Sequence, residues 1–347
     1  MRTRDDLWQM QLLPLDLKIR LSEARIRQWV NEFGQDGVYV SYSGGKDSTV
    51  VSHLVDDVFP GNQIPRIFVN TGLEYPEIVQ FVKQEPRAKI IRPEMNFKKV
   101  IETYGYPIAN KEVSKRIHEY RAAVAKGKDV TQTSAWKEFN GCQTFQGQYE
   151  ECESEYNKTK WKFLLDAPFK ISNRCCDVMK KNPLKHVGGL APITGQLAEE
   201  SRARLKNWVR HGCNAFDSTH PVSNPIAFWK EQDVLMYIKS RGIKIASVYG
   251  DICSDTRSED VANGQMRIED FLGGECKLRT TGCTRTGCMF CCYGAHRDKK
   301  GEGRFLLMKE THPKIYEWIM KPISDGGLGF KDVIDWMNEH GGLHIEY

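Results

Sequence analysis

Residues 37 to 49 read GVYVSYSGGKDST, and this stretch decides the fold. Its first half is short, apolar and rich in valine and tyrosine, which predicts a buried strand. Two glycines, a lysine, an aspartate and several hydroxyl residues follow at once, and a helical apolar pattern begins at residue 47. A glycine turn between a strand and a helix exposes backbone N–H groups at the helix start, where the helix dipole favours negative charge. The stretch therefore predicts an anion site, and phosphate is its natural ligand.

The side chains of this loop also suit phosphate. The glycines allow a tight turn, the lysine adds a full positive charge, and the hydroxyl groups are hydrogen-bond donors. The glycine spacing differs from that of the Walker A loop. An ordinary strand-to-helix turn with a solvated lysine is the alternative. We expect the phosphates to be held by Ser43, Gly44, Gly45, Lys46, Asp47 and Ser48.

Helical and strand patterns alternate on both sides of the loop. Residues 16 to 33 carry apolar residues at helical spacing before the first strand. Strands separated by helices of this length predict right-handed βαβ units, with ligand sites at the carboxyl ends of the strands. The predicted fold class is α/β, a doubly wound and mostly parallel sheet. The elements expected after the loop are helices over 47 to 59 and 75 to 84 and strands over 66 to 70 and 88 to 93.

The later part of the chain is less regular. Polar, helix-leaning sequence without strand signals fills residues 105 to 185, which predicts a helical insertion. We expect residues 1 to 250 to form the α/β domain and residues 251 to 347 to form a cysteine-rich, helical segment that packs on it. The other expected elements are a strand over 190 to 195, a helix over 225 to 243 and an amphipathic helix over 304 to 320.

Composition narrows the class of protein. The chain has 347 residues, 40% of them hydrophobic, and a formal net charge of +5. These values describe a globular protein that tolerates a polyanionic partner without requiring one. No apolar run approaches the about 20 residues that span a bilayer, and the first residues lack the apolar centre of a secretory signal. We expect a cytoplasmic protein without a membrane partner.

Cysteine usage indicates a metal. There are 11 cysteines, an odd number in a chain without an export signal, which disfavours a disulfide framework. Cys175 and Cys176 are adjacent, and five more cysteines lie between residues 276 and 292. Clustered thiols in a reducing compartment suggest metal coordination. We expect the remaining cysteines to be buried small side chains or bystanders: Cys142, Cys152, Cys213 and Cys253.

The segment SGGKDS matches the PP-loop, so the chain resembles the ATP pyrophosphatases of the adenine nucleotide alpha-hydrolase fold. The resemblance implies that ATP is bound through its β and γ phosphates and attacked at its α phosphorus, which leaves an adenylylated substrate and pyrophosphate. One branch, the phosphoadenylyl-sulfate (PAPS) and adenylyl-sulfate (APS) reductases, binds a sulfonucleotide in the same pocket. In this interpretation Lys46 stabilises the departing pyrophosphate and Asp47 engages Mg²⁺.

Three further segments resemble the reductase branch, in the family's order. NTGLEYPE (70 to 77) is similar to its second nucleotide motif, with Asn70 in place of the usual aspartate. ITGQLAEESRAR (193 to 204) is similar to its Gly-x-x-x-x-Glu-Ser-x-x-Arg segment, and NPIAFWKEQDVLMYI (224 to 238) is similar to its helix with Trp-x-x-x-Asp-Val. The resemblance implies a catalytic Arg204 that meets a phosphate or sulfate. It also implies that the nucleotide is bordered by Thr71, Gly72, Gly195, Glu200 and Ser201.

The cysteine-rich segments resemble the iron-sulfur APS reductases. RCCDVMKKNPL (174 to 184) is similar to their Cys-Cys followed by Lys-x-x-Pro-Leu, and GCMFC (287 to 291) supplies the matching Cys-x-x-Cys. The resemblance implies a [4Fe-4S] cluster, which requires four thiolates. A tetrahedral zinc site, in which Cys276 or Cys283 joins the Cys-x-x-Cys pair, is the alternative, and Cys283 and Cys292 are substitutes as cluster ligands. The ligands implied by the resemblance are Cys175, Cys176, Cys288 and Cys291.

One departure separates the chain from the true reductases. They carry a catalytic cysteine in a C-terminal Glu-Cys-Gly-Leu-His pattern, whereas this chain reads EHGGLHIEY, with no cysteine after Cys292. A chain that combines cluster ligands with the lack of a terminal nucleophile resembles the DNA phosphorothioation proteins of the Dnd and Ssp systems and some iron-sulfur tRNA thiolases. That resemblance implies that ATP adenylylates an oxygen of DNA or RNA. Sulfur delivered by a cysteine desulfurase, or through the cluster, then displaces AMP.

Two other functions stay open. A genuine PAPS or APS reductase would use an internal nucleophile such as Cys213 or Cys253 and release sulfite. A non-catalytic module would bind nucleotide as a regulator or scaffold and leave it intact. The basic segments KRIHEYRAAVAKGK (115 to 128) and HRDKKGEGR (296 to 304) offer charge to nucleic acid, although such runs also occur as solvated faces. A homo-oligomer is compatible with the sequence.

Overall fold

The chain divides into two compact units, each built from several separate segments. The structure is a computed structural model, and it describes residues 2–143, 148–150, 156–254 and 277–347. The first unit contains residues Met1–Asn70, Glu74–Ile91 and His186–Gly287. The second contains Thr71–Leu73, Arg92–Lys185 and Cys288–Tyr347.

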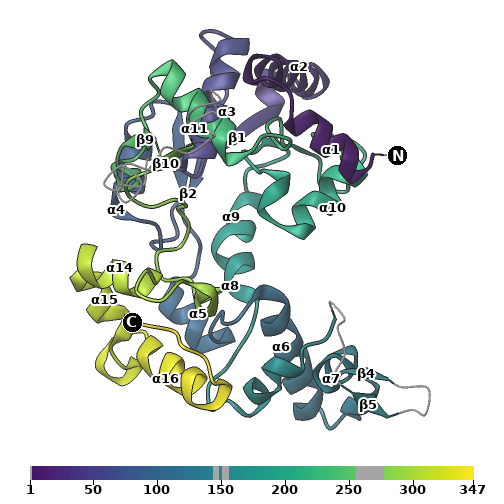
Figure 1. The fold of residues 1–347 in the computed structure, drawn as a ribbon, viewed down its shortest axis with the longest axis vertical. Coiled ribbons are helices and arrows are strands. Elements are labelled where there is room, and N and C mark those ends of the chain that lie inside the picture. The colour runs from purple at the N-terminus through teal and green to yellow at the C-terminus, as the bar shows by residue number, and fades with distance from the viewer. Residues whose placement is uncertain (1, 144–147, 151–155, 255–276) are drawn as a thin grey trace, which may run out of the picture. The chain divides into compact units, whose positions relative to one another are not determined.

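The first unit contains a six-stranded, mostly parallel sheet (Figure 1). Strand β1 pairs in parallel with β2 on one side and with β6 on the other, where Val38 lies opposite Ala191. Only the edge strand β7 runs antiparallel, against β8. The predicted doubly wound α/β fold is therefore confirmed. In spatial order the strands are β3 (Ala88–Ile91), β2 (Arg66–Val69), β1 (Val38–Ser41), β6 (Ala191–Ile193), β8 (Val222–Ser223) and β7 (Asn214–Ala215).

Helices with one apolar face cover this sheet. Helix α2 packs against α3, and α3 packs against β1 and α11. Trp29 of α2 and Val50, Val51 and Leu54 of α3 are fully buried, as Val38 and Val40 of β1 are, so the core lies between these helices and the sheet. The helices predicted over 16 to 33, 47 to 59 and 75 to 84 are confirmed within one or two residues. The helices of this unit are α1 (Arg4–Gln11), α2 (Leu15–Phe33), α3 (Lys46–Val58), α4 (Pro76–Lys83), α10 (Arg202–His211) and α11 (Glu231–Arg241).

The strand order reverses at β1, and this reversal places the site. From β1 the chain continues to β2 and β3 on one side of the sheet, whereas β6 and β8 lie on the other side. The loops that leave the carboxyl ends of β1 and β6 therefore diverge to opposite sides. In open α/β sheets a crevice forms at such a point, and ligands bind there. A small antiparallel pair, β9 (Ile252–Ser254) with β10 (Leu278–Thr280), completes the described part of this unit.

The second unit is almost entirely helical, as predicted for residues 105 to 185. The expectation that this stretch contains no strand was wrong, because β4 (Cys142–Gln143) pairs with β5 (Tyr149–Glu150). Strands of two residues are too short to leave an alternating pattern. The helices are α5 (Phe97–Tyr104), α6 (Lys111–Ala125), α7 (Ser134–Asn140), α8 (Arg174–Cys176), α9 (Asn182–Lys185), α14 (Arg304–Thr311), α15 (Pro313–Met320) and α16 (Phe330–Gly341).

Two predicted helices differ from the observed ones. The helix expected from residue 225 begins at Glu231, because the Lys230 N–H donates to the Asp233 carboxylate at 2.7 Å and so starts the helix there. The helix expected over 304 to 320 is two helices separated at His312, because Pro313 has no N–H and disfavours helical backbone before it. Among the residues described, no helix combines the length and the apolar character needed to cross a bilayer.

Candidate functional site

The loop after β1 is held in shape by its own hydroxyl groups. The Ser43 N–H donates to Ser48 Oγ at 3.2 Å, and the Gly45 N–H donates to Ser43 Oγ at 3.3 Å. Ser48 and Thr49 donate from their side chains to the Gly45 carbonyl at 2.9 and 3.0 Å. Ser43 and Ser48, which the sequence analysis predicts as phosphate ligands, therefore also preform the loop. Its backbone is ordered before any ligand arrives.

Gly44 has a conformation and a location that only glycine fits. Its φ of +71° lies in the left-handed region. A Cβ at this position would also lie 2.7 Å from Val82 Cγ2 and 2.9 Å from Ile78 Cγ2. Helix α4 therefore packs directly on the loop, and this close packing explains the first of the two glycines.

Gly195 brings the loop after β6 against the start of α3. A Cβ on Gly195 would lie 2.7 Å from the Asp47 carbonyl carbon and 2.9 Å from the Ser48 nitrogen. Both are backbone atoms of the first turn of α3, so neither can move aside cheaply. The sequence prediction placed Gly195 at the nucleotide, and the structure places it beside Asp47 of the loop.

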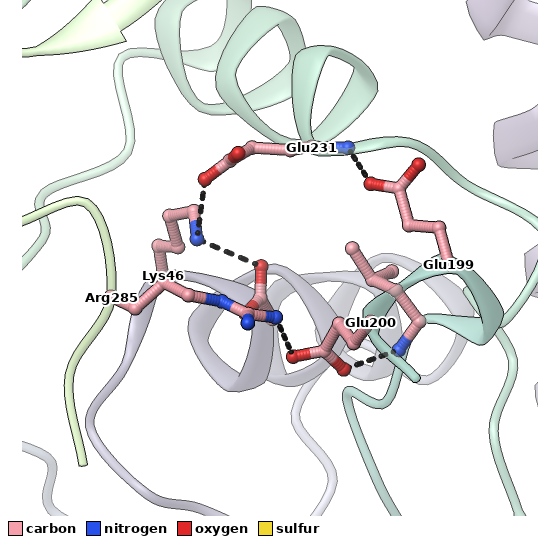
Figure 2. A pocket seen from close by; sticks show the side chains of 7 residues that line it. Lys46, Glu199, Glu200, Glu231 and Arg285 are labelled. Atoms are coloured by element: carbon pink, nitrogen blue, oxygen red, sulfur yellow. Dashed lines mark hydrogen bonds and ion pairs between the residues drawn. The ribbon is translucent and has the colours of Figure 1, made fainter. Parts of the chain in front are cut away.

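Lys46 is the centre of the site (Figure 2). Its side chain is only 4% exposed, and Nζ lies 3.2 Å from Glu231 Oε1 and 3.6 Å from Asp47 Oδ1. Nζ also donates to the Thr284 carbonyl at 3.2 Å. The Lys46 backbone N–H lies in the first turn of α3 and therefore has no partner within the helix. It donates to the Tyr249 hydroxyl at 3.1 Å.

The sequence analysis missed four residues that reach this site. Tyr249 and Thr286 share a hydrogen bond of 2.6 Å at the Lys46 backbone. Glu231 and Arg285 bring charge to the same place. The segment TTGCTRTG (280 to 287) was interpreted only through its cysteine. Its threonines and arginine beside two glycines were the one local signal that could have identified it as a second loop at the site.

A pocket of about 330 Å³ opens beside Lys46, with charged residues as most of its lining. Glu200 accepts a hydrogen bond from Arg285 at 2.5 Å and forms an ion pair with Arg204. Ser201 caps α10, because its hydroxyl accepts the Arg204 N–H at 3.2 Å. The predicted residues Glu200, Ser201 and Arg204 thus lie together at one side of the pocket. The lining residues are Lys46, Asp47, Leu197, Glu199, Glu200, Glu231 and Arg285.

The environment of the Asp47 carboxyl group disfavours its ionised form. Burial raises its pKa above the ordinary value of 3.8, and Glu231 raises it further, while Lys46 opposes both effects. Oδ1 is buried and has no hydrogen-bond partner in the described part of the chain. A buried carboxylate oxygen without a donor is the type of ligand that Mg²⁺ takes. Asp47 therefore fits the magnesium role that the sequence analysis expected.

Thr71 and Gly72, the predicted second nucleotide motif, belong to the second unit. Thr71 Oγ1 accepts the Leu73 N–H at 3.2 Å, and Gly72 has a φ of +76°. The Leu73 carbonyl accepts the Met289 N–H at 2.8 Å, which ties the motif to the Cys-x-x-Cys segment. Their place at a nucleotide stays a prediction.

The four predicted cluster ligands all lie in the second unit. Burial raises the pKa of the Cys175 thiol, and charge on Cys176, Cys288 and Cys291 raises it further. The sulfurs of Cys176, Cys288 and Cys291 are therefore within electrostatic reach of Cys175. The two adjacent cysteines end α8 just before a π-helical turn over Asp177–Lys181, a distortion that is often found at functional sites.

Neighbouring groups support the Cys-x-x-Cys turn. Burial raises the pKa of the Cys291 thiol, and a hydrogen bond from the Tyr293 backbone N–H partly opposes that increase. Arg304 donates to the carbonyls of Cys291 and Tyr293 at 2.8 and 3.0 Å. The same guanidinium is held by Asp298 at 2.6 Å.

Within the described ranges, no three or more His, Cys, Asp or Glu side chains are close enough to hold a metal ion. A single ion needs its ligands in one tetrahedron, whereas a cubane cluster binds each thiolate at a separate iron and holds them farther apart. The role of the four cysteines as ligands of a [4Fe-4S] cluster or of a zinc ion stays a prediction.

The other cysteines are less suited to chemistry. Cys213 is 6% exposed, and burial raises the pKa of its thiol. Cys292 is also buried, with a raised pKa. Cys253 and Cys283 are half-buried in the first unit. Cys152 and Cys276 lie outside the described residues, as does the side chain of Cys142.

The position of the reductases' terminal cysteine is closed to a side chain. In the pattern Glu-Cys-Gly-Leu-His that position corresponds to Gly341 of the segment HGGLH. A Cβ on Gly341 would lie 2.3 Å from Phe163 Cζ, because the end of α16 packs on that ring. A thiol at this point would require the ring to move.

A family model and a solved structure are similar to this chain. The crystal structure of phosphoadenylyl-sulfate (PAPS) reductase from Candida auris, in its phosphate complex, is similar at 15% identity with a TM-score of 0.34. That match covers 67% of this chain and 88% of the reductase chain. No curated protein matches the chain. The family model of the phosphoadenosine phosphosulfate reductase domain matches residues 37–161 and 142–293. Because the two matched segments of the family model span most of the chain, the chain belongs to the phosphoadenosine phosphosulfate reductase domain family.

Proposed function

We propose that this family member uses ATP to adenylylate an oxygen of a nucleic acid, so that sulfur can replace that oxygen. The observation that carries the proposal is the charge around Lys46. The phosphate loop is intact, yet the pocket beside it is lined by four carboxylates and two cations. Such a lining suits a polyphosphate that arrives with a divalent cation better than a sulfonucleotide without one.

The residues of the loop have separate roles in this proposal. The N–H groups at the start of α3 and the ammonium group of Lys46 would hold the phosphates. Lys46 would also neutralise the charge that develops on departing pyrophosphate. Asp47 would hold Mg²⁺ through the oxygen that has no hydrogen-bond partner in the described part of the chain. Arg204 and Arg285, which share Glu200, would face the α-phosphate side of the pocket.

The reaction has two steps. In the first, the acceptor oxygen attacks the α-phosphorus of ATP, and the bond to the β-phosphate breaks with its electron pair on pyrophosphate. In the second, a sulfur nucleophile at the oxidation level of sulfide attacks the activated centre, and AMP leaves with the original oxygen. A cysteine desulfurase with a reductant would supply that sulfur. The activation is needed because an unmodified oxygen is a poor leaving group.

The cysteines of the second unit would hold a [4Fe-4S] cluster, which transfers electrons or binds sulfur when it is present. Cys175, Cys176, Cys288 and Cys291 are the ligands proposed. Arg304 would keep the Cys291 turn in place through its two carbonyl contacts. The closed position at Gly341 supports a reaction that does not pass through the reductases' terminal thiol.

A nucleic-acid partner is supported by a small set of exposed cations. In the segment KRIHEYRAAVAKGK, Arg116 forms an ion pair with Glu138, and Arg121 donates hydrogen bonds to backbone carbonyls. Neither side chain is therefore available to phosphates. In HRDKKGEGR, by contrast, Arg297, Lys299 and Lys300 are exposed. We propose that these three contact the nucleic-acid backbone. Affinity for DNA or RNA should then fall steeply with salt, and reversing these charges should reduce the slope.

Product analysis on anaerobically purified protein tests the proposed function. One reaction contains ATP, Mg²⁺ and nucleic acid, and a second contains PAPS and thioredoxin. Pyrophosphate and AMP from the first, abolished by K46M, are the expected result. K83M, which removes an exposed lysine of α4, is the matched control. Sulfite from the second reaction with ATP left intact would instead establish a reductase.

The reductase alternative has one specific difficulty. It needs an internal thiolate, and burial of Cys213 disfavours its ionised form. Cys253, which is half-buried on β9, is therefore the better candidate. Loss of sulfite release in C253A but not in C213A would support it. A non-catalytic module would bind nucleotide in both reactions and release nothing.

A further inference from the structure

We infer that Glu231 makes the phosphate site selective for a magnesium-chelated polyphosphate over the free anion. The inference rests on the proposed use of Lys46 as a phosphate ligand. It adds a specificity-determining residue from α11, which no phosphate-loop motif contains. It does not depend on which acceptor or sulfur donor the reaction uses.

The contacts of Lys46 show that one partner must leave when a phosphate arrives. Nζ has three neighbours: the Thr284 carbonyl at 3.2 Å, Asp47 Oδ1 at 3.6 Å and Glu231 Oε1 at 3.2 Å. The Lys46 side chain is 4% exposed and cannot turn to solvent. The Glu231 side chain is 46% exposed, so it can swing away at little cost. The Glu231 carboxylate thus occupies the position that a phosphate oxygen would take on Lys46.

Glu231 cannot move far once it is displaced. It is the first residue of α11, and its backbone N–H is held by Glu199 Oε1 at 2.8 Å (Figure 2). Its carboxylate therefore stays near the incoming anion. The field of Glu231 also reaches Asp47, where it raises the pKa of the carboxyl.

The remaining charges of the pocket do not compensate for this repulsion. Arg285, the other cation of the lining, is already paired with Glu200. A free polyphosphate carries several negative charges, and it would meet the carboxylates of a displaced Glu231 and of Glu199. A magnesium ion bound to the polyphosphate reduces that charge, and the repulsion falls with it. Glu231 therefore penalises the free anion more than the magnesium complex.

A structural role for Glu231 must be separated from this one. An acidic residue in the first turn of a helix is favourable for the helix dipole, and removal of the side chain could weaken α11. Glutamine keeps the size of the side chain and removes the charge. Aspartate keeps the charge and draws the carboxylate back from Lys46. E231Q and E231D therefore test charge and reach separately, and thermal unfolding shows whether each variant is folded.

The experiment measures binding of inorganic pyrophosphate by calorimetry, with chelator and with excess Mg²⁺, to the wild type, E231Q, E231D and E199Q. E231Q should bind free pyrophosphate roughly two- to fivefold more tightly than the wild type, the scale of one partly exposed ion pair. With Mg²⁺ the difference should fall below about twofold. E231D should lie between the wild type and E231Q. E199Q removes a charge from the same lining without touching Lys46, so its effect should be smaller.

Four results would overturn the inference. E231Q could bind free pyrophosphate no more tightly than the wild type, or bind the magnesium complex more weakly. E199Q could tighten binding as much as E231Q, which would show that the effect comes from the total negative charge of the pocket and not from the contact of Glu231 with Lys46. Binding undetectable in both the wild type and E231Q would also contradict it. The calorimetry measures binding and not turnover. ATP that stays intact in product analysis would therefore refute the proposed function, whereas this inference would still be decided by the pyrophosphate affinities.

Discussion

Gly195 and Asp47 approach so closely that a single methyl group on Gly195 would lie 2.7 Å from the Asp47 carbonyl carbon. The contact joins the loop after β6 to the first turn of α3. It brings two segments that are far apart in the sequence to opposite sides of one crevice. The position of the Glu200 and Arg204 side chains relative to Lys46 depends on this approach.

G195A should therefore damage the site. The new methyl group meets backbone rather than a flexible side chain, so overpacking should cost about 1 to 3 kcal/mol of stability and should weaken ATP binding. Thermal unfolding and nucleotide titration measure the two effects. G37A is the control, because its Cβ would lie 3.4 Å from Phe33 Cβ, an ordinary contact. Equal behaviour of the two variants would show that the loop after β6 is not held tightly.

Asp47 should make the protein less stable as pH rises. Burial raises its folded-state pKa above 3.8, so the folded state binds this proton more tightly than the unfolded state. The stabilisation from the proton is complete below pH 3.8 and is lost as pH rises through the folded-state pKa. D47N should therefore melt at a higher temperature than the wild type at neutral pH, and the difference should shrink toward pH 4. A difference that is constant with pH would refute the shift.

The cluster proposal predicts which cysteines retain iron. Anaerobically purified wild type should contain roughly four iron ions per chain, and C175A and C288A should lose most of them. C213A should keep its iron, because Cys213 belongs to the first unit, whereas the four proposed ligands belong to the second. Chemical iron and sulfide analysis with visible absorption measures both. Zinc in place of iron, lost in C288A but not in C175A, would favour the zinc alternative.

Arg304 should hold the Cys291 turn through geometry that lysine cannot reproduce. Its planar group reaches two carbonyls and the Asp298 carboxylate together. R304K should lose at least one of these charged hydrogen bonds, each worth about 1.5 to 3 kcal/mol. The expected result is faster release of iron to a chelator. R297K, at an exposed neighbour, should leave the rate unchanged, and equal rates in both variants would argue against the role.

The parts predicted from the sequence are those with a local signature. The loop was visible because glycine, lysine and hydroxyl residues follow a strand pattern directly, and β1 to β3 were visible because helices separate them. The break at Pro313 also has a local signature, a proline inside the apolar helical pattern, although one helix was predicted there. The late start of α11 depends on one carboxylate, Asp233, that caps it.

Two of the missed site residues, Glu231 and Tyr249, had no such signature. Glu231 and Tyr249 reach Lys46 only because α11 and the turn before β9 fold back onto α3. Nothing in their immediate sequence distinguishes them from surface residues. Tertiary contacts between distant segments determined their role, and sequence patterns within a single window do not report such contacts.

The pairing of β1 with β6 also has a consequence for how the chain is made. Residues of β1 and β2 leave the ribosome long before residues 191–193, which supply the other neighbour of β1. Until then one side of β1, including the valines at 38 and 40, presents unpaired backbone groups to any other nascent chain. Parallel pairing across so long a loop is slow. The chain should therefore need chaperones or low temperature during synthesis, and fragments that end before β6 should aggregate.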